Sequence, residues 1–421
     1  MIEWTEEKLD KVHSIMLEIL IEIDRICRVN HIKYSLTGGT LLGAVRHEGF
    51  IPWDEDADVA MLRSEYRKFR KAAKRDLDRS RFFIQDHDTD PKYRWGYPKV
   101  RRKGTVYSRD GEILIGNADG IFVDILVMDN IPDNERLRKW HKDCCTGIRG
   151  MMYSTVGKHR EQDAKKRHQY EVWSHIPIGC VFFMKSLLAA AFRWKRTELV
   201  GHYTLPYGDG MYGMPRICFD EMMDVDFEGY TFRAYKKYDL YLRTLYGDYH
   251  NAPGDCKPHL EIARMKFVKP RLPKQLDKIH VTEEDKVIPD TWGTIIYKKD
   301  GEKKKIVCYG INTLDLVREG NRELKKLKEN LRIFQENAAD VTLLLILNKP
   351  MGAVRFDNAK VQKNFQILIQ RFKNSGFGIY DDTCNFGRAL ALCDAYYGDW
   401  CKVTWYFRKQ GKPVMIQNLE V

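Results

Sequence analysis

Apolar positions in the first 130 residues follow two different spacings. Residues 9–27 carry apolar side chains at intervals of three and four, which predicts one face of an α-helix. The segment KYSLTGGTLLGAVR then predicts a short strand, a Gly38-Gly39 turn and a helix that begins near Thr40. Residues 57–62 (ADVAML) and 121–127 (IFVDILV) predict strands, because short apolar runs are bounded by turn formers. Helices and strands therefore mix in this region.

Helical patterns dominate residues 131–245, with a strand or two around FEGYTF and a short helix near 238–246. One stretch, residues 176–192, is almost wholly apolar and has basic residues on both sides. It is slightly shorter than the roughly 20 residues that cross a bilayer, and it contains Lys185. We expect a buried core helix here, with a membrane-surface contact as the alternative.

The pattern changes after residue 267. Pro258, Pro270, Pro273 and Pro289 punctuate a polar stretch without clear periodicity, which predicts an interdomain linker, with the domain boundary at 268–290. Beyond it, strand and helix patterns alternate: strands at 304–312 and 341–347, helices at 313–337 and 358–375, then GFGIYDD, ALALCDAYYGDW and GKPVMIQN. This alternation predicts a Rossmann-like parallel α/β domain over 291–421, after an α+β domain with helical additions over 1–267. The fold class is α/β.

Composition narrows the classes of protein. The 421 residues include 71 Lys and Arg against 59 Asp and Glu, and the net charge of +12 favours anionic partners in general. The first ten residues do not resemble a secretory signal, and ten scattered cysteines without a CxxC pair fit a reducing compartment better than disulfides or structural zinc. We expect a cytoplasmic protein, with the inner face of the membrane as a further possibility.

Chemistry concentrates in YSLTGGTLLGAVRHEGFIPWDEDADVAMLRSEY, residues 34–66. Asp54, Asp56 and Asp58 alternate with other residues, so an extended chain projects all three to one side. Carboxylates this close repel one another unless a cation neutralises them, and hard oxygen ligands suit Mg²⁺ or Mn²⁺. The alternative is a solvated acidic turn.

Asp124 lies inside the apolar strand 121–127, where an unpaired carboxylate would be costly. It needs either the same cation as the other aspartates or a salt bridge to an Arg or Lys. The Gly38-Gly39 turn offers backbone N–H groups at a helix start, which suit a phosphate, although most such pairs are simple turns.

A Gly-Gly turn, an aspartate pair and a third aspartate on another strand follow the order of the nucleotidyltransferase fold. The segment GGTLLGAVRHEGFIPWDEDADVAM closely resembles the signature of the LicD family, which includes phosphocholine transferases of bacterial surface glycans and is related to fukutin-type ribitol-phosphate transferases. The resemblance continues through YPKVR, GIFVDILVMDNIPD, FEGYTF and YDLYLRTLYGDY, over about the first 260 residues. This chain lacks a proline that members often carry in the segment at 231–239.

The resemblance implies a set of site residues. Asp56, Asp58 and Asp124 would be the metal-binding and catalytic carboxylates, with Asp54 in support. The residues it assigns to substrate binding are Gly38, Gly39, His47, Trp53, Lys99 and Arg101. Lys99 and Arg101 would neutralise a diphosphate, with ordinary surface cations as the alternative; His47 could equally make a structural hydrogen bond and Trp53 could equally be core.

The region from about 292 resembles the nucleotide-binding half of glycerophosphotransferase-like, GT-B-type enzymes. Cys401 and Lys402 stand where that pattern has two serines, and LNKPMG replaces an Arg-Pro-His-Pro-like loop. We expect this domain to lack transferase activity and to act as a scaffold or acceptor-docking domain, with Asp399 and Lys402 at most a relic or altered pocket.

The function implied by the family is metal-dependent transfer of a phospho-alcohol, above all phosphocholine, from a CDP-activated donor to a hydroxyl of a cell-surface glycan or its lipid-linked precursor, as in lipopolysaccharide or teichoic acid. No nucleic-acid partner is expected. Two alternatives remain: nucleotidyl transfer to a small molecule or nucleic acid, and a non-catalytic glycan-assembly subunit. Three acids gathered near one ion argue against the last.

Overall fold

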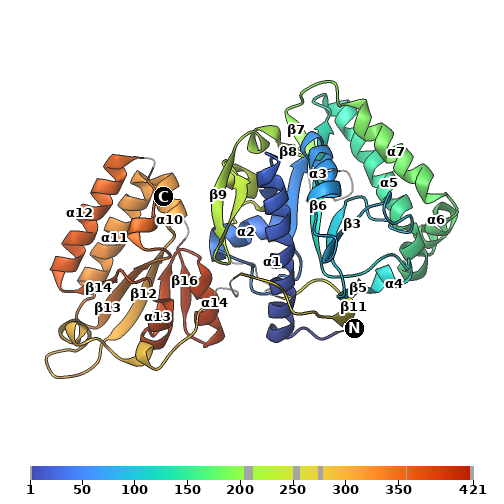
Figure 1. Ribbon diagram of the computed structural model, residues 1–421. Coiled ribbons are helices and arrows are strands. Elements are labelled where there is room, and N and C mark those ends of the chain that lie inside the picture. Colours follow the sequence, from blue (N-terminus) through green and yellow to red (C-terminus); the bar gives the residue numbers. More distant parts are fainter. Residues whose placement is uncertain (1, 203–211, 250–256, 274–277, 357, 418–421) are drawn as a thin grey trace. The chain divides into compact units, whose positions relative to one another are not determined.

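The computed structural model describes residues 2–202, 212–249, 257–273, 278–356 and 358–417, and it divides into two compact units (Figure 1). The first unit comprises Met1–Ala44, Gly49–Tyr249 and Asp255–Leu276. The second comprises Val45–Glu48, His250–Gly254 and Asp277–Val421. Within the predicted linker, residues 274–277 lie outside the described residues.

The described part of the first unit contains a seven-stranded mixed sheet. Its order is β1-β2-β6-β4-β3, with β7 beside β6 and β8 beside β7. Strand β2 runs parallel to β6, and β6 runs antiparallel to β4. The strands expected at 57–62 and 121–127 are confirmed as β2 and the first part of β6. The bounds are β1 Ser35–Leu36, β2 Asp58–Leu62, β3 Phe82–Gln85, β4 Lys99–Arg102, β6 Phe122–Ile131, β7 Leu199–Gly201 and β8 Met214–Pro215.

Two smaller antiparallel pairs complete the strands of the first unit that the structure describes. Strands β9 (Met222–Phe227) and β10 (Tyr230–Tyr235) form a hairpin, as the sequence predicts around FEGYTF. Strand β5 (Val106–Arg109) pairs with β11 (Ile262–Lys266), which joins distant parts of the unit.

Helix α1 (Glu6–Val29) confirms the first predicted helix. Its expected apolar face is buried and packs against β4, β6 and helix α3 (Arg63–Asp76). The side chain of Thr5 caps the helix start by accepting a hydrogen bond from the Lys8 N–H. The apolar face explains why this helix covers the sheet.

Helices α5, α6 and α7 gather beside the sheet of the first unit (Figure 1). Helix α7 falls within the apolar stretch 176–192, but only part of its surface is buried: Phe183 is 63% and Leu187 is 54% exposed. In the described chain, no single helix has both the length and the apolar character to cross a membrane; only the bent pair α6 and α7 meets that test together. The helix bounds are α2 Gly38–His47, α4 Asp110–Ile113, α5 Glu135–Arg160, α6 Ala164–Ser174, α7 Ile178–Ala191 and α8 Tyr238–Tyr246, with a 3₁₀ turn at Arg216–Phe219.

The described part of the second unit confirms the predicted Rossmann-like architecture. Its sheet has five strands in the order β14-β13-β12-β15-β16, all parallel. The bounds are β12 Lys305–Ile311, β13 Val341–Leu347, β14 Gly378–Asp381, β15 Ala395–Gly398 and β16 Val414–Ile416; the helices are α9 Gly293–Ile296, α10 Thr313–Glu319, α11 Asn321–Glu336, α12 Ala359–Ser375, α13 Phe386–Leu392 and α14 Lys402–Lys409, with 3₁₀ turns at Glu284–Lys286, Asp290–Trp292 and Met351–Ala353.

Helices cover both faces of this parallel sheet (Figure 1). Alternate residues of β12 and β13 enter two separate cores, one shared with α10, α11 and α12 and the other with α13 and α14. The single helix expected over 313–337 is wrong. Gly320 adopts a φ of 38° between α10 and α11, which ends the first helix and starts the second.

Candidate active site

Three charged side chains lie in a row across neighbouring strands of the first unit. Asp58 is the direct partner of Asp124 in the parallel pairing of β2 with β6. Asp124 is in turn the direct partner of Lys99 in the antiparallel pairing of β6 with β4. Paired residues project to the same side of a sheet, so the fold brings these groups together from positions far apart in sequence.

The lysine of this row is an ion-pair partner of Asp124. Lys99 Nζ donates a hydrogen bond to Asp124 Oδ1 at 2.6 Å and lies 3.3 Å from the centroid of the Phe122 ring. Lys99 is 0% exposed and Asp124 is 4% exposed. The salt bridge that the sequence left open for Asp124 is therefore present, and the alternative that Lys99 is a surface cation is wrong.

Burial shifts both groups of this pair toward their neutral forms. It lowers the pKa of Lys99 to about 8, although the Asp124 carboxylate opposes that change. It also raises the pKa of Asp124, although Lys99 and Arg109 oppose that change. The surroundings of the pair therefore stabilise the charged forms of both groups poorly. A bound cation would favour the ionised form of Asp124.

The segment before β2 brings further carboxylates to the same place. From residue 54 to residue 58, half-buried aspartates alternate with the buried Glu55 and Ala57, as expected for an extended chain. His13 Nε2 lies 2.6 Å from the Asp54 carbonyl oxygen, and the Tyr107 hydroxyl donates to the Glu55 carbonyl oxygen at 2.7 Å. These contacts fix the segment that positions Asp54 and Asp56.

This cluster is not a solvated acidic turn. Burial raises the pKa of both Asp54 and Asp58 well above the ordinary value, and the nearby Asp56 carboxylate adds to the increase in each. Partial burial and like charges held close together are the usual causes of such shifts at functional sites.

Gly38 and Gly39 lie directly against these carboxylates at the start of α2. A Cβ atom on Gly39 would lie 2.5 Å from Asp54 Oδ2, and one on Gly38 would lie 3.4 Å from Asp58 Oδ2. The Thr40 hydroxyl accepts a hydrogen bond from the Asp58 N–H at 2.8 Å, so the helix start is tied to the strand start. The positive end of the helix therefore meets the aspartates, while the Gly38 N–H donates to the Tyr241 hydroxyl.

Arg109, at the end of β5, is a cation of this site that the sequence analysis missed. Its Nη2 atom lies 4.0 Å from Asp56 Oδ2, and its buried Nε has no hydrogen-bond partner among the described residues. Burial opposes its charge, but Tyr97 and the Asp124, Glu112 and Asp56 carboxylates raise its pKa. In the sequence, Arg109 is only a basic residue among strand-forming residues. Nothing in that position indicates that its side chain lies near Asp56.

His259 is a second residue that sequence reasoning missed. Its Nδ1 lies 3.1 Å from Glu55 Oε1 and its Nε2 lies 3.8 Å from Asp56 Oδ2. The backbone N–H groups of His259 and Leu260 also donate to Glu55 Oε1. His259 precedes β11, 204 residues after Glu55 in the sequence, so only the tertiary fold reveals the contact.

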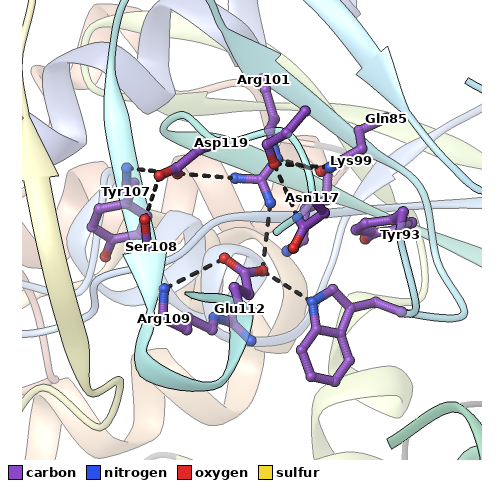
Figure 2. A network of polar contacts seen from close by, with 12 residues as sticks. Gln85, Tyr93, Lys99, Arg101, Tyr107, Ser108, Arg109, Glu112, Asn117 and Asp119 are labelled. Carbon is purple, nitrogen blue, oxygen red and sulfur yellow. Dashed lines mark hydrogen bonds and ion pairs between the residues drawn. The ribbon is translucent and has the colours of Figure 1, made fainter. Parts of the chain in front are cut away.

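Arg101 lies on the same strand as Lys99 and takes part in a buried polar network that includes Gln85, Glu112 and Asp119 (Figure 2). Its guanidinium donates to the Gly120 carbonyl oxygen at 2.6 Å and to Gln85 Oε1, and it pairs with Glu112 at 3.4 Å. Arg101 is 0% exposed, so it is not a surface cation. These contacts connect β4 with β3, the loop before β6 and α4, which is a structural arrangement.

The remaining two predicted residues lie near the end of α2 and just after it. His47 is buried within the segment Val45–Glu48, which groups with the second unit, and burial lowers its pKa to about 3. Trp53 is half-buried in the turn that precedes Asp54. His47 therefore belongs to a different compact unit from the carboxylates. Trp53 directly precedes Asp54 in the sequence.

The donor set can be tested for its fit to a divalent cation. Carboxylate oxygens are the ligands that Mg²⁺ and Mn²⁺ prefer, and the raised pKa values of Asp54 and Asp58 mark a place where added positive charge stabilises the ionised forms. Among the described residues, Asp54, Glu55 and His259 form the group whose candidate ligand atoms all lie within 4.8 Å of one another. Glu55 Oε2 is buried and has no hydrogen-bond partner in that same part of the chain. This three-residue group contains none of the predicted ligands Asp56, Asp58 and Asp124, although His259 Nε2 also lies 3.8 Å from Asp56 Oδ2. The chemistry of the carboxylates gathered here fits such an ion.

Comparison with known proteins places this geometry in context. Residues 31–112 match the model of the LicD/FKTN/FKRP nucleotidyltransferase domain. The chain is 28% identical over 255 residues to the lipopolysaccharide cholinephosphotransferase LicD of Haemophilus influenzae, a match that covers 58% of this chain and 93% of that protein. Shorter matches occur to uncharacterized proteins of Rickettsia typhi (36% over 56 residues) and Rickettsia prowazekii (38% over 50 residues), covering 13% and 12% of this chain and 18% and 19% of those proteins.

The domain match spans the Gly-Gly turn, the aspartate segment, Lys99 and Arg109, and the longer match extends well beyond it. Residues 31–112 therefore match the LicD/FKTN/FKRP nucleotidyltransferase domain, and a more distant similarity to LicD extends over 255 residues of the chain.

Proposed function

We propose that this LicD-family transferase moves a phospho-alcohol, above all phosphocholine, from a CDP-activated donor to a hydroxyl of a cell-surface glycan or its lipid-linked precursor, with Mg²⁺ or Mn²⁺. The observation that carries the proposal is the row Asp58, Asp124 and Lys99 beside the start of α2. The extent of the match to a lipopolysaccharide cholinephosphotransferase supports the phospho-alcohol class.

In this proposal the aspartates and the nearby cations have different roles. Asp56 and Asp58 would hold the cation, which when bound neutralises the diphosphate and stabilises the charge of the leaving nucleotide. Asp124 would complete the carboxylate set and remain anchored by Lys99. Arg109, with an unused buried Nε, is suited to contact a donor phosphate oxygen.

Proton transfer is the second task of the site. Asp124 could accept the proton of the attacking hydroxyl, as the family resemblance suggests. Its hydrogen bond from Lys99 weakens it as a base, because the same contact stabilises the carboxylate. Asp54 and Asp58, whose pKa values burial and Asp56 raise, are alternative acceptors within the same cluster.

The donor can be tested without knowing the acceptor. Isothermal calorimetry would measure binding of CDP-choline, CDP-ethanolamine, CDP-glycerol and CDP-ribitol, with Mg²⁺ and with a chelator. The wild-type protein is compared with Asp56→Asn/Asp58→Asn, and Asp226→Asn in β9 is the matched control because Asp226 is an exposed carboxylate remote in sequence. We expect Mg²⁺-dependent binding of one donor, lost in the double variant and kept in the control.

Two outcomes would contradict the proposal. If no CDP-alcohol binds while nucleoside triphosphates do, nucleotidyl transfer becomes the better assignment for the same carboxylates. If a donor binds equally well to the folded double variant and in chelator, the aspartates do not form the donor site.

A further inference from the structure

Helix α7 is apolar around its whole circumference, yet only one side of it is covered. Val181, Leu188 and Ala189 are buried and share a core with Cys145, Ile148 and Met152 of α5. A helix that is apolar all round needs an apolar environment on every side. The packing on α5 covers the side of α7 that carries these three residues.

The other side of α7 is exposed and carries no charge. Its exposed residues are Gly179, Cys180, Phe183, Ser186, Leu187 and Ala191. Lys185 is the helix's one charged residue, and its ammonium donates to the Gly96 carbonyl oxygen within the protein. Trp194, just beyond the helix, is 82% exposed and extends this apolar surface.

Basic residues frame this surface at both ends. Lys165, Lys166 and Arg167 are exposed at the start of α6, which precedes α7. Arg193, Lys195 and Arg196 are exposed directly after α7. The Arg193 guanidinium lies 4.3 Å from the centroid of the Trp194 ring, while Lys195 pairs with Asp133 at 3.7 Å and Arg196 with Asp220 at 2.8 Å. An uncharged apolar face can enter the region between lipid headgroups and acyl chains, and cations beside it are attracted to anionic lipid.

A cation-rich cleft opens along the same helix. It has a volume of about 980 Å³ and lies between α7 and α3, beside the carboxyl ends of β2 and β6. Eight of its lining side chains are Arg or Lys and three are Asp. Arg63 pairs with Asp129, and Arg70 pairs with Asp86 and Asp88. The other lining cations outnumber the acids and extend positive charge along the wall beside α7.

We propose that the exposed face of α7, with Trp194 and its basic frame, docks on the surface of a bilayer that contains anionic phospholipid. The apolar side chains enter the interface between headgroups and acyl chains, and the cations contact lipid phosphates. The helix lies on the membrane and does not cross it, because α7 has 14 residues and its inner face is committed to α5. The inference does not depend on the proposed donor or reaction.

Vesicle sedimentation tests the proposal on the full chain. The probes are phosphatidylcholine vesicles with and without about one-third phosphatidylglycerol, at low and high salt. We expect sedimentation with the anionic vesicles, weakened by salt because exposed charges are screened. The variant Phe183→Ser/Leu187→Ser/Trp194→Ser should bind at least about tenfold more weakly, since it removes three apolar anchors.

Controls separate membrane contact from folding and from catalysis. Ile333→Ser/Met415→Ser removes exposed apolar side chains of the second unit (44% and 65% exposed) and should sediment like the wild type. Asp56→Asn/Asp58→Asn should also sediment like the wild type, so a failed donor assignment leaves this result intact. Thermal midpoints are compared for all variants.

Three results would overturn the proposal. The first is no sedimentation of the wild type with anionic vesicles, and the second is equal sedimentation of the wild type and a folded triple variant. The third is a dimer, measured by sedimentation velocity without vesicles, that the triple variant converts to a monomer while vesicle binding is absent; that result would assign the face to a second copy of the chain.

Discussion

Each unit contains a buried aspartate that faces a lysine, and the two pairs differ in what surrounds them. In the second unit, Asp399 Oδ1 accepts from Lys326 Nζ at 2.5 Å and Asp399 Oδ2 accepts from the Asn312 N–H at 2.9 Å. In the first unit, Asp124 accepts from Lys99 at a similar distance of 2.6 Å, but its neighbour across the sheet is another aspartate, Asp58.

The pKa shifts of the two lysines differ in direction because their surroundings differ. In the second unit, Asp399 and Glu323 raise the pKa of Lys326 against the opposing effect of burial. In the first unit, burial lowers the pKa of Lys99 to about 8 despite Asp124. Carboxylates also lie close together in the second unit, where burial and Asp399 raise the pKa of Glu323 to about 7, but Lys326 is at ion-pair distance from both acids. Asp54 and Asp58 lack such a cation among the described residues, which indicates a site that binds a ligand.

The sharpest test of this contrast is Asp58→Asn. Under the proposed function we expect turnover to fall by at least about a thousandfold, because the variant loses a ligand of the cation that would neutralise the diphosphate. The free energy of unfolding should stay the same or rise slightly, because the change removes like-charge repulsion. A radiolabelled-donor transfer assay and denaturant unfolding measure the two effects; a folded variant with full metal-dependent activity would refute the site.

The same chemical change in the second unit should affect stability. Asp399→Asn leaves the buried Lys326 ammonium with Glu323, at 3.4 Å, as its remaining counter-charge, and we expect the unfolding free energy of that unit to fall by about 2 kcal/mol. Denaturant unfolding followed by circular dichroism would resolve this loss. A stability equal to that of the wild type would mean that Asp399 is not a structural charge.

Local patterns in the sequence predicted much of the fold. The apolar period of α1, the short strands β2 and β6, and the strand and helix alternation of the second unit all depend on spacing within a few residues. The break at Gly320 was missed because a lone glycine within a helical pattern does not reveal its φ angle.

The sequence predicted those site residues whose positions follow from local patterns. The alternation of Asp54, Asp56 and Asp58 follows from an extended chain, and Asp124 was suggested by its apolar strand. The Lys99 pair, the approach of Arg109 and the contacts of His259 come from sheet order and from the β5–β11 pairing, which no local pattern specifies. Arg101 shows the opposite limit. The family resemblance assigned it to substrate binding, but in the fold its side chain contacts Gly120 and Glu112 inside the protein.

The smallest effect we predict comes from Gly39→Ala, which changes no charge. The added methyl group would lie 2.5 Å from Asp54 Oδ2, so the flexible carboxylate must move away from the helix start. We expect turnover to fall by about 10- to 100-fold, because small displacements in a reacting cluster are costly, while the fold remains intact.

Gly147→Ala is the matched control for this change. A Cβ atom on Gly147, inside α5, meets nothing within 4 Å, so that variant should keep its activity and gain about 0.5–1 kcal/mol of stability from higher helix propensity. The comparison isolates the position of Asp54 from the general effect of replacing a helical glycine. Full turnover in Gly39→Ala would mean that Asp54 need not lie beside the start of α2, and the carboxylates that matter would then reduce to those on β2, on β6 and at Asp56.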